Sequence, residues 1–118
     1  MTKLPLEGII VIDFSTLIAA PLVGSLMADF GAEVIKVELP KVGDPQRGNQ
    51  LGGNRRSPNW IVGSRNKKTI TLDLHKKEGQ DIAKKLCAKA DVVLLNFRPG
   101  VLEKWNLGSE ILHQVNPE

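Results

Sequence analysis

Gly8-Ile-Ile-Val-Ile-Asp-Phe14, near the start of the chain, is a short apolar run rich in β-branched residues. Such a run, placed after a proline and a glycine, is typical of a strand that is buried on both of its faces. Strands of this kind usually lie in parallel sheets. The segment therefore predicts an internal strand of a parallel sheet.

A helix and a second strand are predicted next. From Pro21 to Phe30 apolar residues recur at the spacing of one helical face, with proline in the permitted first turn and Gly31 after the end. The segment 32–38 predicts a strand that ends before Pro40. A strand, helix and strand in this order predict a right-handed parallel unit. The expected buried face of the helix consists of Leu22, Val23, Leu26, Met27 and Phe30.

The rest of the chain repeats the alternation of strand and helix after a long interruption. Glycines and prolines break every period from Leu39 to Lys68, so this segment is expected to be a loop. The later elements are predicted as a half-buried strand at 69–74, a helix at 76–89 with Ile82, Ala83, Leu86, Cys87 and Ala90 on its apolar face, a strand at 90–97, and short helices at 99–107 and 109–114, the last capped by Ser109.

This pattern predicts an α/β fold with a mostly parallel sheet and flanking helices. Such sheets usually have five or six strands, whereas four are predicted here. We therefore expect residues 1–118 to form one part of a larger domain, with about four strands of a larger sheet.

Composition narrows the class of protein. The chain has 118 residues, of which 42% are hydrophobic and 25% charged, as in an ordinary globular domain. One cysteine and two histidines provide neither a disulfide framework nor a structural zinc site, so we expect no metal and a cytoplasmic location. We find no signal peptide and no run long enough to span a membrane, and expect no membrane partner. A net charge of +3 with five aromatic residues disfavours nucleic-acid binding.

Ligands of open α/β sheets bind beyond the carboxyl ends of the strands. The segments 15–21, 72–75 and 96–100 are expected at that edge. They contain no G-x-G-x-x-G fingerprint and no P-loop, which argues against an ordinary dinucleotide site and an NTPase. Arg98 is interpreted either as a surface or capping residue or as a bidentate phosphate contact. The residues alone thus indicate an anion-binding domain.

Several other residues are expected to have structural roles and not to bind a ligand or react. Asp13 is predicted to hydrogen-bond the turn that follows its strand. Lys67 and Lys68 are predicted to be solvated at the start of a strand, and Cys87 to be a core residue. The two histidines, His75 and His113, have no acid at a sequence spacing that implies contact.

Six motifs stand out along the chain. They are Pro5-Leu-Glu-Gly-Ile9, Ala20-Pro21, Leu26-Met-Ala-Asp-Phe-Gly-Ala-Glu-Val-Ile-Lys-Val-Glu38, Gly43-Asp-Pro-Gln-Arg-Gly48, Arg65-Asn-Lys-Lys-Thr-Ile-Thr-Leu-Asp-Leu74 and Ala90-Asp-Val-Val-Leu-Leu-Asn-Phe-Arg-Pro-Gly-Val-Leu-Glu-Lys104. In this order and spacing they resemble the N-terminal part of the family III CoA-transferases, the CaiB/BaiF group. This family includes formyl-CoA transferase, carnitine CoA-transferase and α-methylacyl-CoA racemase.

The resemblance implies a Rossmann-like domain that binds CoA, and a homodimer of interlinked chains. His75 replaces a common lysine, which weakens a phosphate contact near neutral pH. Leu39 stands where many members have arginine after the acid that corresponds to Glu38. The residues that match CoA-contacting positions of the family are Ala19, Leu72, Asp73, Leu74, His75, Asn96, Phe97, Arg98 and Lys104.

The resemblance also implies a reaction. In the transferases an aspartate beyond this length attacks the acyl-CoA thioester, and CoA is then passed to an acceptor carboxylic acid. The racemases exchange an α-proton with a histidine and acids, again beyond this length. No position in 1–118 matches either set, so we assign no catalytic residue and expect the chain alone to be inactive. The alternatives are a racemase of the same family and a non-catalytic module for CoA binding or assembly.

Overall fold

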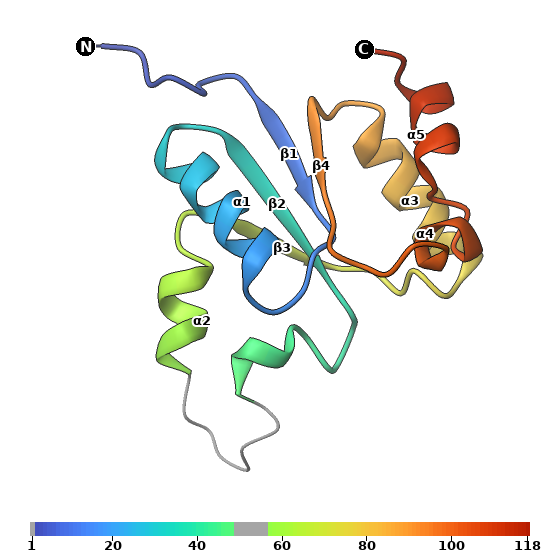
Figure 1. Cartoon of the computed structure of the whole chain (residues 1–118), viewed down its shortest axis with the longest axis horizontal. Helices are drawn as coiled ribbons and strands as arrows, with labels where there is room; N and C mark the ends of the chain where they lie inside the picture. Colours follow the sequence, from blue (N-terminus) through green and yellow to red (C-terminus); the bar gives the residue numbers. More distant parts are fainter. Residues whose placement is uncertain (1, 49–56) are drawn as a thin grey trace.

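Four parallel strands form the sheet of this computed structural model, which describes residues 2–48 and 57–118 (Figure 1). All three pairings are parallel, and the strand order is β3-β2-β1-β4. The predicted α/β class and all four predicted strands are therefore confirmed, although each strand is shorter than its apolar run. The strands are β1 (Ile10–Asp13), β2 (Glu33–Glu38), β3 (Lys68–Thr71) and β4 (Val92–Leu94).

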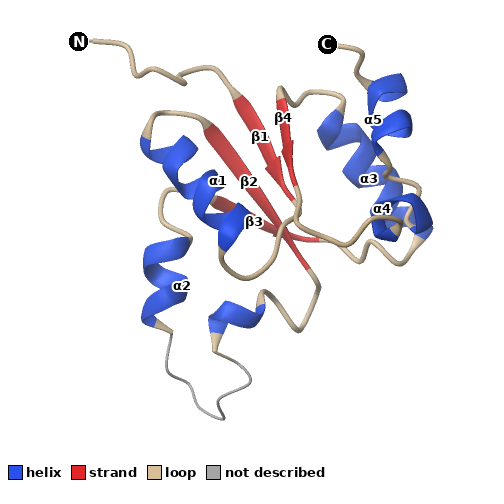
Figure 2. Cartoon of the chain, viewed as in Figure 1, coloured by secondary structure: helices blue, strands red, loops and turns tan. Residues whose placement is uncertain are grey.

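Helices flank the sheet on both sides (Figure 2). The sheet separates the buried residues into two clusters. One cluster of buried residues, around Val11 and Val34, packs with Ala28 of α1. The other, around Ile12 and Val37, packs with α3 and the C-terminal helices. Neighbouring strand residues thus face opposite layers, as a sheet covered on both sides requires. The helices flanking these clusters are α1 (Ala19–Asp29), α3 (Lys77–Cys87), α4 (Val101–Lys104) and α5 (Ser109–Val115).

The predicted loop from Leu39 to Lys68 contains two helical elements, so that prediction was wrong in part. A 3-10 helix, η1, covers Pro45–Arg47, and α2 covers Pro58–Gly63. Both are too short to show a helical period, but each begins with proline after a residue that favours a helix start. Residues 49–56 of the predicted loop lie outside the described residues.

The predicted apolar face of α1 contacts the core only at Met27, which is partly buried against the cluster of Val11 and Val34, and the prediction was wrong for the rest of that face. Leu22, Val23, Leu26 and Phe30 are between 44% and 54% exposed, and the helix instead buries Pro21, Gly24, Ser25 and Ala28. These small residues allow close approach, since a Cβ on Gly24 would lie 3.1 Å from Asp13 Oδ2 and 3.2 Å from Leu94 Cδ1. The helix packs through its narrow face because only that face fits against the sheet.

Two further predictions concern the C-terminal half. Ala83 and Cys87 of α3 are buried as predicted, whereas Ile82 is 45% exposed. The N-cap of α5 is Gly108, not Ser109, because Gly108 is the last residue with extended backbone and its carbonyl accepts from Leu112 N. No helix in the described part of the chain is long and apolar enough to cross a membrane.

Candidate functional site

A cleft of about 270 Å³ opens at the carboxyl edge of the sheet. The segments that follow β1, β2, β3 and β4 all contribute to it, together with Trp105 after α4. Its walls are mostly apolar, with a few polar groups at intervals. The lining residues are Phe14, Thr16, Val37, Glu38, Leu39, Val42, Gly43, Asp44, Pro45, Leu72, Leu74, His75, Phe97 and Trp105.

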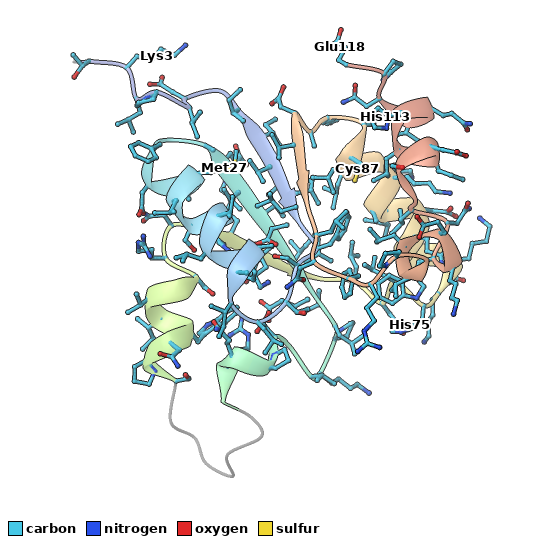
Figure 3. All side chains as sticks on the ribbon, viewed as in Figure 1. Lys3, Met27, His75, Cys87, His113 and Glu118 are labelled. Carbon is cyan, nitrogen blue, oxygen red and sulfur yellow. The ribbon has the colours of Figure 1, made fainter. Side chains whose placement is uncertain are left out.

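Two chain segments predicted to contact CoA meet in this cleft. Leu72, Leu74 and His75 line it from the loop after β3, and Phe97 lines it from the segment after β4. The residues lie on the two sides of α3 in the sequence, so the fold brings them together. A second cavity, of about 250 Å³ between α5 and β4, is lined by Cys87 and His113. Figure 3 shows these two residues towards the opposite end of the sheet from His75.

His75 forms one edge of an aromatic wall. Its ring lies 5.0 Å from that of Trp105, and Trp105 lies 5.2 Å from Phe97, both in edge contact. Aromatic pairs at these distances attract beyond their apolar burial. The wall therefore offers the cleft a rigid surface against which a flat apolar group can pack.

The His75 imidazole also has an acid partner, so the expectation that it had none was wrong. Its Nδ1 lies 3.0 Å from Asp73 Oδ1, which also accepts from His75 N at 3.1 Å. The hydrogen bonds from the His75 side chain and backbone lower the pKa of Asp73. An aspartate that bonds the backbone two residues later is a common local turn, and this was the signal available in the sequence.

Asn96 joins the loops that follow β1 and β4. Its Oδ1 accepts from Thr16 N at 2.9 Å, and its Nδ2 donates to Thr16 O at 2.7 Å. Two loops that are 80 residues apart in sequence are thus tied directly together. Of the other predicted site residues, Ala19, Arg98 and Lys104 are exposed and do not line the cleft. Lys104 is on α4, immediately before the cleft residue Trp105.

A buried ion pair borders the cleft, since one of its members, Asp44, is a lining residue. Lys36 Nζ lies 3.2 Å from Asp44 Oδ2, and both side chains are almost completely shielded from solvent. The same ammonium donates to Ser15 O at 2.7 Å. Sequence reasoning missed this pair, because Lys36 was not singled out within the strand predicted at 32–38.

A second buried ion pair connects β1 to the residue before β3. Lys67 Nζ lies 2.8 Å from Asp13 Oδ2, and neither side chain is accessible to solvent. Burial lowers the pKa of Lys67, against the opposing effect of Asp13. The expectation of a solvated Lys67 was therefore wrong. The exposed Lys68, which pairs with Glu33 at 2.7 Å, agrees with its prediction, and so does the Asp13 Oδ1 bond from Ser15 N at 3.0 Å.

A third acid–base pair fixes the wall formed by the β2–η1 segment. Arg47 donates to both oxygens of Glu38, from Nε at 2.6 Å and from Nη2 at 2.7 Å. Its guanidinium also lies 3.9 Å from the centre of the Trp60 ring. A planar arginine fork suits both contacts at once. Arg47 therefore links the cleft wall to α2.

The described residues contain no group of three or more His, Cys, Asp and Glu side chains that could hold a metal ion. Cys87 is buried, as predicted, and burial raises the pKa of its thiol to about 11. This thiol is a core group and is poorly suited to act as a nucleophile.

A parallel sheet with flanking helices and a cleft at its carboxyl edge defines a Rossmann-like α/β chain. The model of the family described as CoA-transferase family III matches residues 6–118. The chain belongs to this family. The sequence-based resemblance is therefore confirmed.

The relatives and solved structures extend well beyond this chain. It is 51% identical over 116 residues to "Succinyl-CoA--D-citramalate CoA-transferase" of Chloroflexus aurantiacus, covering 96% of this chain and 28% of the relative. It is 40% identical over 119 residues to "Formyl-CoA:oxalate CoA-transferase" of Bradyrhizobium, covering 100% and 28%. The solved structure of a CaiB/BaiF family protein from Brucella suis matches with a TM-score of 0.88 and 38% identity, over 98% of this chain and 32% of that one. The chain thus spans less than a third of these proteins.

Proposed function

We propose that residues 1–118 are the N-terminal, CoA-binding part of the large Rossmann-like domain of an acyl-CoA:carboxylate CoA-transferase. The observation that carries the proposal is the convergence of two segments on one cleft, which Leu72, Leu74 and His75 line from the first segment and Phe97 from the second, whereas Asp73 and Asn96 do not line it. These are the segments that match CoA-contacting positions of the family. Family membership over residues 6–118 supports the same assignment.

The cleft supplies two kinds of contact that suit CoA. The aromatic wall of Phe97, Trp105 and His75 suits a flat nucleotide base. Arg98 follows Phe97 in the sequence and Lys104 precedes Trp105, and both are exposed. Their side chains can donate charged hydrogen bonds to phosphate oxygens. In this proposal the base enters the cleft while the phosphates remain at its rim.

The chemical step belongs to residues outside 1–118. In the family's transferases an aspartate attacks the thioester carbonyl, which releases the CoA thiolate and leaves a mixed anhydride. The thiolate then attacks the aspartyl carbonyl and releases the donor carboxylate, which leaves an aspartyl-CoA thioester. The acceptor carboxylate attacks this thioester and displaces the CoA thiolate, and the thiolate attacks the acceptor carbonyl of the new anhydride, which regenerates the aspartate. The contribution of this chain is to bind and orient CoA, and the chain alone is expected to be inactive.

The proposed substrates are an acyl-CoA and a small carboxylic acid, and the proposed location is the cytoplasm. The names of the two relatives above pair a short acyl-CoA with an acceptor acid, which favours a transferase over a racemase. The proposed assembly is an interlinked homodimer. Another relative, 48% identical, is named as the beta subunit of "Succinyl-CoA--L-malate CoA-transferase" of Chloroflexus aurantiacus, so a two-chain assembly is the competing outcome for a mass measurement.

Calorimetric titration of the purified protein with CoA tests the proposal. Arg98→Ala and Lys104→Ala should each weaken binding by about 1–3 kcal/mol, because each removes a charged hydrogen bond to a phosphate. Lys85→Ala is the matched control, since it removes an exposed lysine from α3 and should leave the affinity unchanged. No binding by the wild type, or equal affinity in all three variants, would overturn the proposal.

A further inference from the structure

Residues 15–21, the β1–α1 loop together with the first turn of α1, are held by side chains from three other parts of the chain. Lys36 of β2 donates to Ser15 O at 2.7 Å, and Lys67 donates to Pro21 O at 2.5 Å. Asp44, which precedes η1, accepts from Leu17 N at 3.3 Å. Asn96 binds both the N–H and the carbonyl of Thr16. The backbone of this loop is therefore fixed by charged and amide side chains rather than by its own apolar residues.

The loop belongs to the cleft, and its conformation is strained. Thr16 lines the cleft, and so does Asp44. Leu17 has φ of +65°, a left-handed conformation that residues other than glycine rarely adopt. Such a residue persists where surrounding contacts over-determine it, and it is a common feature of ligand sites. The Asp44 contact to Leu17 N is one of these contacts.

The two buried ion pairs are poorly explained by a contribution to the free energy of folding alone. Removing two charges from water costs about as much as, or more than, their attraction returns, and apolar replacements are often equally stable. Both lysines also donate to backbone carbonyls of this segment, Lys36 to Ser15 in the loop and Lys67 to Pro21 in the first turn of α1. An apolar pair could not donate these hydrogen bonds to the backbone. The lysines therefore have a role that apolar residues could not replace.

We propose that Lys36 and Lys67 are positioning residues that hold the β1–α1 loop in the conformation that receives CoA. The proposal rests on the proposed CoA site, and it adds two residues whose side chains are buried and do not line the cleft. Asp44 and Asp13 act with them by fixing the ammonium groups and the amides of Leu17 and Ser15. Loss of either pair should loosen the loop while the sheet remains intact.

Two double variants test the inference. Lys36→Met/Asp44→Asn and Lys67→Met/Asp13→Asn remove each pair without leaving an unpaired charge. The single oxygen of each asparagine can still accept from one backbone amide, Gln46 N at position 44 and Ser15 N at position 13. The expected result is a CoA dissociation constant raised tenfold or more, with the urea midpoint of unfolding unchanged. Lys68→Met/Glu33→Gln is the control, because it removes an exposed lysine–carboxylate pair that also joins β2 and β3, and it should change neither quantity.

A merely structural role gives the opposite pattern. The urea midpoint would then fall, and the CoA affinity of the folded fraction would remain within twofold of the wild-type value. Either result in both double variants overturns the inference. Absence of CoA binding in the wild type would instead overturn the proposed function.

Hydrogen exchange in the wild-type protein gives a test that needs no variant to fold. A preorganised loop predicts that the Leu17 amide is protected in the free protein and gains little when CoA is added. Fast exchange of Leu17 in the free protein would overturn the inference.

Discussion

Gly79, in the first turn of α3, is packed directly against the backbone of Asp73. A Cβ added to it would lie 2.1 Å from the Asp73 carbonyl oxygen and 2.7 Å from the carbonyl carbon, whereas real Cβ contacts essentially begin at 3.0 Å. Gly79→Ala is therefore a perturbation whose target is backbone, not the end of a flexible side chain. The helix and the loop that carries Asp73 and His75 must separate by about 1 Å.

The sign of the effect distinguishes local propensity from tertiary packing. Alanine in place of glycine within a helix stabilises by about 1 kcal/mol when nothing else changes. Overpacking of a buried site costs about 1–3 kcal/mol, and a backbone clash belongs at the upper end. We expect a net loss of about 2 kcal/mol, which corresponds to a melting temperature lowered by roughly 8 °C for a chain of this size.

Urea unfolding followed by circular dichroism gives the free energy of unfolding, and CoA titration gives the effect on the site. Because the loop that moves carries His75, the CoA affinity of the folded variant should fall as well. Glu78→Ala is the control, since Glu78 is exposed in the same turn and should change stability by less than about 0.5 kcal/mol. A Gly79→Ala protein as stable as the wild type, or more stable, would refute the packing argument.

Two more outcomes follow from groups buried near the cleft and in the core. Burial raises the pKa of Glu38, but the hydrogen bonds from Arg47 and Asp44 N and the positive charges of Arg47 and Lys36 outweigh it, so the pKa is held below its usual value. The ionised carboxylate thus contributes stability above its unfolded pKa, and this contribution disappears as the pH falls through the lower folded value. The difference in unfolding free energy between the wild type and Glu38→Gln should therefore shrink between about pH 6 and pH 3, and a constant difference would contradict the assignment. The Cys87 thiol, whose pKa burial raises to about 11, should react with iodoacetamide far more slowly at pH 8 in the native protein than in urea, and equal rates would show that it is accessible.

The strands were predictable because their signal is local. A strand buried on both faces is an unbroken apolar run, and β1 and β4 both carry one. The face of α1 was not predictable in the same way. Periodicity detects an apolar stripe but cannot show that Gly24 and Ala28 fit against the sheet more closely than Leu22 and Leu26.

In the candidate site too, contacts between residues close in sequence could be predicted, whereas contacts between distant residues could not. The contact of Asp73 with His75 spans two residues and could have been found from the sequence. Lys67 and Asp13 are 54 residues apart, and a lysine is rarely buried unless it is paired. Its burial therefore becomes visible only when the fold has brought its partner to it.

The reciprocal bonds between Asn96 and Thr16 have a consequence for how the molecule folds. They join residues 80 positions apart, whereas β1 and β2 pair across a single helix. Closing the longer loop costs about 1 kcal/mol more in chain entropy, so β4 should dock after the first three strands have paired. The cleft is then completed in the last step, and a ligand that binds there stabilises the docked strand by mass action. A chain that is still folding would pair its first three strands before it gains affinity for the ligand. A chain that is heated would lose this affinity before its central strands separate.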